Sequence, residues 1–229
     1  MTVATDPRTR SLPLRQALGI PLNVFFFLLL MVMGWGDVRG FFADPTRVLM
    51  VVLLAGAAPV MTICTGGRSR GIEHAPDVPW FFPALVFHSL FTAFVMPYMD
   101  ARDVWTIPGG EGLRWAGVTL FALGVLWRLG PMVTLGRRFT SVVALQQEHR
   151  LHTGGFYAAV RHPSYLGIVL MDLGFAGIYR SALALALMPL VFLMFHRRMN
   201  VEEALLLRRF GEDYRAYMAR TARLLPGLH

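Results

Sequence analysis

The sequence predicts an all-α integral membrane protein with about six transmembrane helices, of which the last two form a helical hairpin, and with a C-terminal amphipathic helix on the cytoplasmic surface. The chain of 229 residues is 55% hydrophobic and only 16% charged. Its mean hydropathy is +0.50, so it has too little charge to cover a soluble globule. Several apolar runs approach the roughly 20 residues that a helix needs to cross a bilayer. Tryptophans lie near the ends of these runs, as is typical of the membrane interface.

Four apolar segments account for the first four predicted crossings. These segments are residues 17–35, 48–64, 80–99 and 113–133. The next apolar stretch, residues 165–195, is too long for a single crossing. Polar residues interrupt it at positions 179–181, so we expect two helices joined by a tight turn. Because the first run is full length and no small-residue cleavage site ends it, we expect no cleaved signal peptide.

The distribution of arginine predicts the orientation in the membrane. Arginines precede the first predicted span and follow the second, whereas the loops after the first and third spans carry balanced charge. Because basic residues accumulate on the cytoplasmic side, the N-terminus is predicted to be cytoplasmic. From residue 134 onward arginines outnumber acidic residues, so the loop at 134–163 and the C-terminus are predicted to be cytoplasmic too. All 22 basic residues are arginine, which fits a GC-rich genome, and we expect the inner membrane of a bacterium.

The composition changes near residue 134 and divides the chain into two predicted parts. Residues 1–133 are expected to form N-terminal membrane-spanning helices, and only His88 is an ionisable residue well inside one of these spans. Residues 134–229 are expected to form a cofactor-binding core that holds the hairpin and the C-terminal helix. We interpret His88, and Asp172 in the hairpin, as packing residues unless a partner or ligand meets them. Cys64, the single cysteine, is interpreted as a buried, unreactive thiol.

Motifs of soluble cofactor enzymes are absent from the sequence. It contains no GxGxxG fingerprint after a strand, no phosphate-binding loop and no CxxC pair. We therefore expect no Rossmann domain, no metal site and no nucleic-acid partner.

The candidate site begins at the run Arg-His-Pro-Ser-Tyr, which directly precedes the long apolar stretch. Pro163 suits the first turn of a helix, which places Arg161 and His162 at the helix N-terminus, where free backbone NH groups favour an anion such as a carboxylate. The alternative is a helix cap with a solvated histidine. Tyr165 and Asp172 are seven residues apart and therefore share one helical face.

A second candidate element follows the hairpin, where apolar residues recur at helical spacing among charges and predict an amphipathic helix. Arg198 and Glu202 are four residues apart, so they can pair on one face of this helix. An exposed pair of this kind is often only a surface ion pair. Its position at the membrane exit of the hairpin, facing the Arg-His-Pro-Ser-Tyr turn, favours a functional role.

Two runs of residues resemble a known family. The run LGRRFTSVVALQQEHRLHTGGFYAAVRHPSYLG, residues 135–167, and the run RRMNVEEALLLRRFGEDYRAY, residues 197–217, are similar to the isoprenylcysteine carboxyl methyltransferase family, within a wider group that includes phospholipid N-methyltransferases. The resemblance implies a pocket for S-adenosylmethionine, with S-adenosylhomocysteine as product, built without a Rossmann domain. It also implies a membrane bilayer and a lipophilic or prenylated substrate as partners.

The same resemblance implies roles for individual residues. Arg198 matches the arginine placed at the substrate carboxylate, and Glu202 matches a cofactor-binding glutamate. A glutamine contact to the cofactor would fall on Gln146 or Gln147, or on neither. The remaining residues that match the cofactor loop and the following turn are His149, Arg150, Leu151, His152, Tyr157, His162, Pro163, Ser164 and Tyr165.

These residue types suit methyl transfer to a lipophilic carboxylate, which is the function we expect. A carboxylate is already ionised at neutral pH, so it needs no general base, and Arg198 could bind it through two parallel hydrogen bonds. The alternatives are methylation of a phospholipid amine or a small thiol, in which Glu202, His162 or Asp172 would act as base. Other possibilities are a membrane binding or transport protein and an NADPH-dependent reductase. Transport is disfavoured because the first four spans carry few polar residues.

Overall fold

The computed structural model describes residues 14–65, 73–74, 80–135, 144–145, 151–225 and 227. Within these residues the chain is almost entirely helical, and the strands are two short segments, β1 (Glu73–His74) and β2 (Ala144–Leu145), which pair antiparallel. A short 3-10 turn, η3, covers Gly155–Ala158. The α-helices are α1 (Leu14–Trp35), α2 (Val38–Ala43), α3 (Pro45–Thr65), α4 (Phe81–Ala101), α5 (Gly110–Leu135), α6 (Pro163–Ile178), α7 (Ala182–Phe210) and α8 (Glu212–Arg220).

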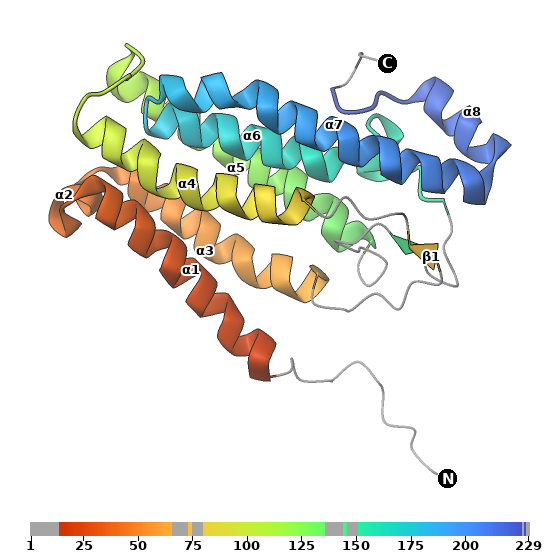
Figure 1. Ribbon diagram of the computed structural model, residues 1–229, viewed down its shortest axis with the longest axis horizontal. Coiled ribbons are helices and arrows are strands. Elements are labelled where there is room, and N and C mark those ends of the chain that lie inside the picture. Colours follow the sequence, from red (N-terminus) through yellow and green to blue (C-terminus); the bar gives the residue numbers. More distant parts are fainter. Residues whose placement is uncertain are drawn as a thin grey trace, which may run out of the picture.

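The long helices run side by side along the long axis of the molecule (Figure 1). The connections from α1 to α3, from α4 to α5 and from α6 to α7 lie at one end of this bundle, and β1 and α8 lie at the other end. Three helices, α4, α5 and α7, are long and apolar enough to cross a membrane by length and composition. Residues 22–35, residues 45–61 and α6 form shorter apolar helices. The helices therefore occupy the positions of the predicted spans.

The predicted hairpin forms as α6 and α7. Pro163 is the first residue of α6, and the polar interruption becomes the turn between the helices. Arg180 adopts a positive φ of 46° in this turn. Ser181 then caps α7, because its hydroxyl accepts a hydrogen bond from the amide of Ala184 at 3.2 Å.

The second hairpin helix is longer than the apolar stretch that predicted it. It continues without a break through the charged segment to Phe210, so residues 196–210, which include most of the charged residues that follow the hairpin, belong to α7 itself. Gly211, with φ 52°, ends α7, and α8 is a short helix after it. The sequence analysis also omitted α2, whose first turn is capped by Asp37.

Glycines allow α5 and α6 to pack with their backbones almost in contact. A Cβ atom at Gly117 of α5 would lie 2.5 Å from the backbone nitrogen of Ile178, and one at Gly174 of α6 would lie 2.4 Å from that of Phe121. Gly124 and Gly167 are equally crowded. Small residues at such contacts are typical of helix pairs in membranes. This close pairing fixes the start of α6 against the end of α5.

Two groups of buried side chains hold the bundle together. One hydrophobic cluster joins the start of α4 to α6 and α7 and includes Phe81, Leu166 and Phe195. At the far end of the bundle, the carboxylate of Asp100 is fully buried between two arginines, with Arg114 at 2.7 Å and Arg180 at 2.9 Å. This ion-pair group ties α4, α5 and the hairpin turn together.

Candidate active site

The turn before α6 is joined to α7 by a histidine that lies between two glutamates. His162 occupies the N-cap position of α6 and is buried. Its Nε2 lies 3.1 Å from Oε1 of Glu203, and its Nδ1 lies 3.4 Å from Oε2 of Glu202. Burial alone would lower the pKa of His162, but the hydrogen bonds and charges of the two glutamates outweigh burial and raise it.

Tyr165 links the other side of Glu202 to Arg198. Its hydroxyl donates a short hydrogen bond to Oε1 of Glu202 and accepts one from Nε of Arg198 at 2.9 Å. Arg198 and Glu202 also form the ion pair that their spacing allows, with Nε and Oε1 3.4 Å apart. The ring of Tyr165 stacks on that of His162, with the planes 9° apart. The four side chains therefore form one polar cluster at the junction of α6 and α7.

Aromatic rings from a third helix cover Arg198. Its guanidinium carbon lies 4.5 Å from the ring centre of Phe81 and 4.9 Å from that of Phe82, both at the start of α4. A guanidinium over aromatic faces gains a cation–π attraction that grows when water is excluded. The side chain of Arg198 is only 3% exposed. Arg198 is thus held where α4, α6 and α7 meet.

The contacts of Arg161 connect parts of the chain to one another and indicate a structural role. Its Nε lies 3.0 Å from Oε1 of Glu203, and its guanidinium also donates to the backbone carbonyls of Met218 and Thr221. The amide of Arg161 donates to the carbonyl of Ala222 at 2.9 Å. Arg161 therefore fastens the segment after α8 to the loop before α6.

Two residues of the site were missed by the sequence analysis. Glu203 binds His162 and Arg161, and its second oxygen lies 3.1 Å from Arg223. Arg128 of α5 donates a short hydrogen bond to the hydroxyl of Ser164. Arg128 could have been identified from the sequence, because it lies inside the predicted fourth span. A charged side chain is energetically unfavourable there unless a polar partner binds it.

The loop before α6 contributes aromatic residues next to this cluster. The ring of His152 packs edge-on against Tyr157, with centroids 5.5 Å apart. The backbone carbonyl of Tyr157 accepts a hydrogen bond from the hydroxyl of Tyr217 at 2.7 Å, which connects the loop to α8. Leu151 precedes them and is half-buried, and Pro163 is buried. Gln146, Gln147, His149 and Arg150 lie outside the described residues.

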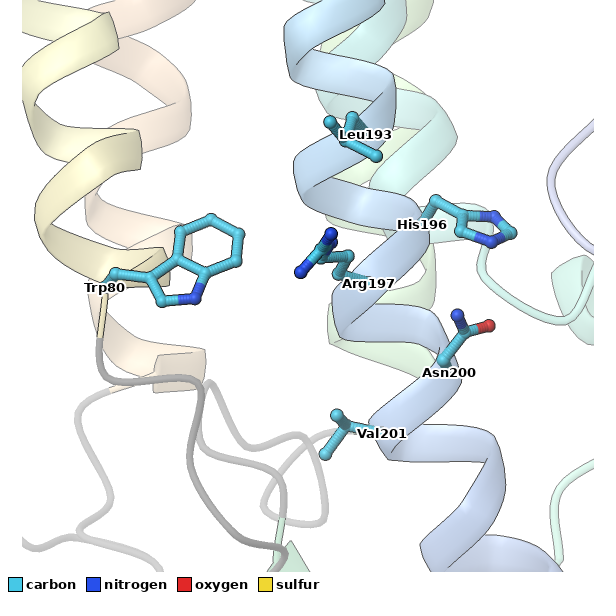
Figure 2. A pocket seen from close by; sticks show the side chains of 6 residues that line it. All are labelled: Trp80, Leu193, His196, Arg197, Asn200 and Val201. Carbon is cyan, nitrogen blue, oxygen red and sulfur yellow. The ribbon is translucent and has the colours of Figure 1, made fainter.

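A hollow of about 560 Å³ lies between the start of α4 and α7. Figure 2 shows Trp80 of the α4 side reaching toward a row of α7 side chains. The lining residues are Trp80, Leu193, His196, Arg197, Asn200 and Val201. The lining combines apolar side chains with the polar side chains of His196, Arg197 and Asn200, which makes this hollow amphipathic.

The fold and the site define a helical membrane-type protein whose buried polar cluster sits at the mouth of a helical hairpin. Residues 117–208 match the model of the isoprenylcysteine carboxyl methyltransferase (ICMT) family. This segment contains α6, α7 up to Arg208, His162, Tyr165, Arg198 and both glutamates. The resemblance to this family that the motifs indicated is therefore confirmed over this segment.

Curated relatives and a solved structure agree with this assignment. Protein-S-isoprenylcysteine O-methyltransferase B of Arabidopsis thaliana is 33% identical over 113 residues, which are 48% of this chain and 57% of the relative. The protein-S-isoprenylcysteine O-methyltransferase of Schizosaccharomyces pombe is 36% identical over 107 residues, 45% of each chain. This chain therefore spans about half the length of these relatives. The structure of the eukaryotic intramembrane Ras methyltransferase ICMT matches with a TM-score of 0.57 and 21% identity, over 90% of this chain and 74% of that one, which shows a shared fold.

Proposed function

We propose that this protein is an integral-membrane, S-adenosylmethionine-dependent methyltransferase that O-methylates a carboxylate of a lipophilic acceptor. The observation that carries the proposal is the buried cluster of Tyr165, Arg198 and Glu202, which lies inside the family-matched segment at the meeting point of α4, α6 and α7. Named relatives act as protein-S-isoprenylcysteine O-methyltransferases, which supports an acceptor with a lipid-like tail and a carboxylate.

Residues of the cluster and the adjoining loop fit the cofactor. S-Adenosylmethionine would supply an activated methyl group. Glu202 keeps 22% of its side chain exposed and carries a negative charge that can bind the cofactor's ammonium group. Among the described residues the indole Nε1 of Trp127 is buried without a hydrogen-bond partner, and Trp127 packs against Phe156 of the loop. A ligand acceptor atom would satisfy this donor.

The family resemblance supplies the remaining proposed cofactor contacts. They come from the loop and from the turn before α6: Gln146, His149, Arg150, Leu151, His152, Tyr157, His162, Pro163, Ser164 and Tyr165.

Arg198 is the proposed acceptor-binding residue. Tyr165 and Glu202 fix one edge of its guanidinium, and the Phe81 and Phe82 rings shield it from water. A carboxylate held here would lose much of its hydration and gain a fixed orientation, the two contributions that an ionised nucleophile needs from an enzyme. The reaction then needs no proton transfer.

The membrane arrangement belongs to the same proposal. Six helices, α1, α3, α4, α5, α6 and α7, would each cross the bilayer, and the end with α8 would face the cytoplasm of a bacterial inner membrane. Residues 134–229 would form the cofactor-binding part and residues 1–133 the helices that adapt it to its acceptor. The charged C-terminal part of α7 would then stand at the cytoplasmic membrane surface, next to the soluble cofactor.

The test is methyl transfer by the full chain purified in detergent. The protein is incubated with methyl-labelled S-adenosylmethionine and either a total lipid extract or an N-acetylated prenylcysteine. Label that base releases identifies an ester and supports a carboxylate acceptor, whereas base-stable label identifies an amine or thiol acceptor. Calorimetry would overturn the methyltransferase assignment if it showed binding of NADPH but no binding of S-adenosylmethionine or S-adenosylhomocysteine.

A further inference from the structure

Two ionisable side chains meet within the apolar part of the bundle, away from the cluster described above. His88 of α4 and Asp172 of α6 face each other, with Nε2 and Oδ2 3.4 Å apart. Their side chains are 11% and 26% exposed. Ionisable residues are costly inside a membrane, and they mark functional sites when no structural need explains them.

The contacts of this pair differ from those of the structural ion pairs in the same protein. Asp100 receives two hydrogen bonds from Arg114, at 2.7 and 3.0 Å, and another from Arg180 at 2.9 Å. In contrast, His88 Nε2 and Asp172 Oδ2 are both buried, and neither has a hydrogen-bond partner within the described part of the chain. A buried polar atom without a partner costs about 1 to 3 kcal/mol, so a pair kept only for stability would be expected to close.

The pair is aligned with the candidate active site. Asp172 follows Tyr165 by seven residues in α6, and His88 follows Phe81 by seven residues in α4. Seven residues are nearly two helical turns, about 10 Å along the axis and on the same face. Phe81 and Tyr165 both contact Phe195. The pair therefore lies on the same side of its helices as the site and about 10 Å deeper in the apolar region.

Apolar side chains occupy the interval between the site and the pair. One hydrophobic cluster contains Phe81 and Phe195 next to the site and continues through Leu85 of α4 and Leu166 and Val169 of α6. An acceptor whose carboxylate lies at Arg198 would place its apolar tail along these residues. The tail would then reach His88 and Asp172.

We propose that His88 and Asp172 form a polar subsite that binds a hydroxyl group on the tail of the acceptor, about two helical turns from the carboxylate that receives the methyl group. This inference rests on the proposed function. A hydroxyl donates to Asp172 Oδ2 and accepts from His88 Nε2, which satisfies both atoms at once. A tail of pure hydrocarbon satisfies neither. The acceptor class is accordingly a hydroxylated lipophilic acid.

The test compares fatty acids that carry one hydroxyl at different chain positions with the unsubstituted acid. For the wild-type protein, kcat/KM should rise roughly tenfold or more at the best hydroxyl position. His88→Leu/Asp172→Leu should lose this preference, so that its kcat/KM values for the hydroxylated and the unsubstituted acids become equal. Thr119→Val, at an exposed position of α5, is the control, because it also removes a polar group from an apolar helix. This variant should keep the higher kcat/KM for the hydroxylated acid.

A second measurement does not depend on turnover. The thermal stabilisation that each acid gives is measured for the wild type, for the double variant and for His88→Phe and Asp172→Asn singly. Loss of the extra stabilisation by the hydroxylated acid in these variants supports the subsite. The subsite proposal is overturned if the hydroxylated acid stabilises the wild type and all variants equally. It is also overturned if the variants melt at a lower temperature but still prefer the hydroxylated acid, because the pair would then be only a structural contact. Absence of methyl transfer to every acid would contradict the proposed function alone, because the binding comparison still decides on the subsite.

Discussion

Glu202 and Glu203 are adjacent in sequence and differ in what surrounds them. Glu203 is only 9% exposed at its side chain and is enclosed by His162, Arg161 and Arg223. Glu202 lies on the more open face, bound to Tyr165 and Arg198. These contacts make Glu203 a structural clamp between the turn, α7 and the C-terminal segment, and they leave Glu202 as the carboxylate that a ligand can reach.

Glu202→Gln keeps the shape of the side chain and removes its charge. Loss of a charge-assisted hydrogen bond in a partly buried site should lower cofactor affinity by about 1.5 to 3 kcal/mol, roughly ten- to hundredfold. Calorimetry with S-adenosylhomocysteine measures this loss. Glu212→Gln, at a side chain that is 80% exposed on α8, is the matched control and should bind normally. Unchanged affinity in Glu202→Gln would mean that Glu202 serves only to hold Arg198.

Arg198→Lys keeps the charge and removes the planar group. The variant loses the Nε hydrogen bond to Tyr165 and the stacking over Phe81 and Phe82. If Arg198 binds the acceptor carboxylate, turnover at saturating cofactor should fall at least tenfold while cofactor affinity barely changes. Arg208→Lys, at an exposed position of the same helix, should have no effect.

Arg198→Met separates the acceptor classes. An amine acceptor in its ammonium form would be repelled by Arg198, so removing the charge would leave turnover intact or raise it. A carboxylate acceptor requires the charge, and turnover should then be nearly abolished. Full turnover in Arg198→Met, measured with the same labelled cofactor, would rule out the carboxylate proposal.

The raised pKa of His162 predicts that the folded protein becomes less stable as the pH rises. A histidine in an unfolded chain has a pKa of about 6.5, and the glutamates raise the pKa of His162 above this value in the folded protein. The stabilisation is fully present below about pH 6.5 and is lost as the pH rises through the raised pKa. Melting temperatures between pH 6 and pH 9 should therefore fall more steeply for the wild type than for His162→Gln. His196→Gln, at an exposed histidine, should follow the wild type, and parallel curves for His162→Gln would contradict the assignment.

At the scale of elements, helix positions follow from composition, whereas their contacts do not. The polar residues at 179–181 predicted the hairpin turn, and Pro163 predicted the start of α6. The change in polarity after Phe195 indicated where the chain leaves the apolar region, but a helix can continue through such a change, and α7 does so. Sequence spacing identified the Arg198–Glu202 pair. It could not identify Glu203 or Arg128, because their partners are 41 and 36 residues away.

The α5–α6 contact offers a test of element packing. In Gly174→Ala the new Cβ would lie 2.4 Å from Phe121 N and 2.7 Å from Gly117 O, which are backbone atoms that cannot rotate away. We expect a loss of about 1 to 3 kcal/mol, seen as a lower melting temperature in detergent. Gly56→Ala in α3, where a Cβ meets nothing within 4 Å, should be neutral or slightly stabilising. Equal melting temperatures for the two variants would show that α5 and α6 can separate without cost.

At the scale of the whole molecule, the two ends of the bundle differ in structure. One end is closed by the buried Asp100 with its two arginines, and the other carries the candidate site, the family-matched residues of α7 and the C-terminal segment. If the site must receive a soluble cofactor and a lipid-borne acceptor, its end should lie at the cytoplasmic membrane surface. The arginine distribution predicts the same orientation.

Cysteine labelling tests this orientation and whether an odd number of crossings separates the α4–α5 connection from the C-terminal segment. In a Cys64→Ser background, Val104→Cys places a thiol at an exposed position of the α4–α5 connection, and Leu225→Cys places one at an exposed position after α8. With cytoplasmic termini and three crossings between the two positions, an impermeant maleimide should label the Val104 variant in intact cells and the Leu225 variant only after permeabilisation. The reverse pattern would invert the orientation. Labelling of both variants from one side would mean that an even number of crossings separates the two positions, so that α5, α6 and α7 do not all cross.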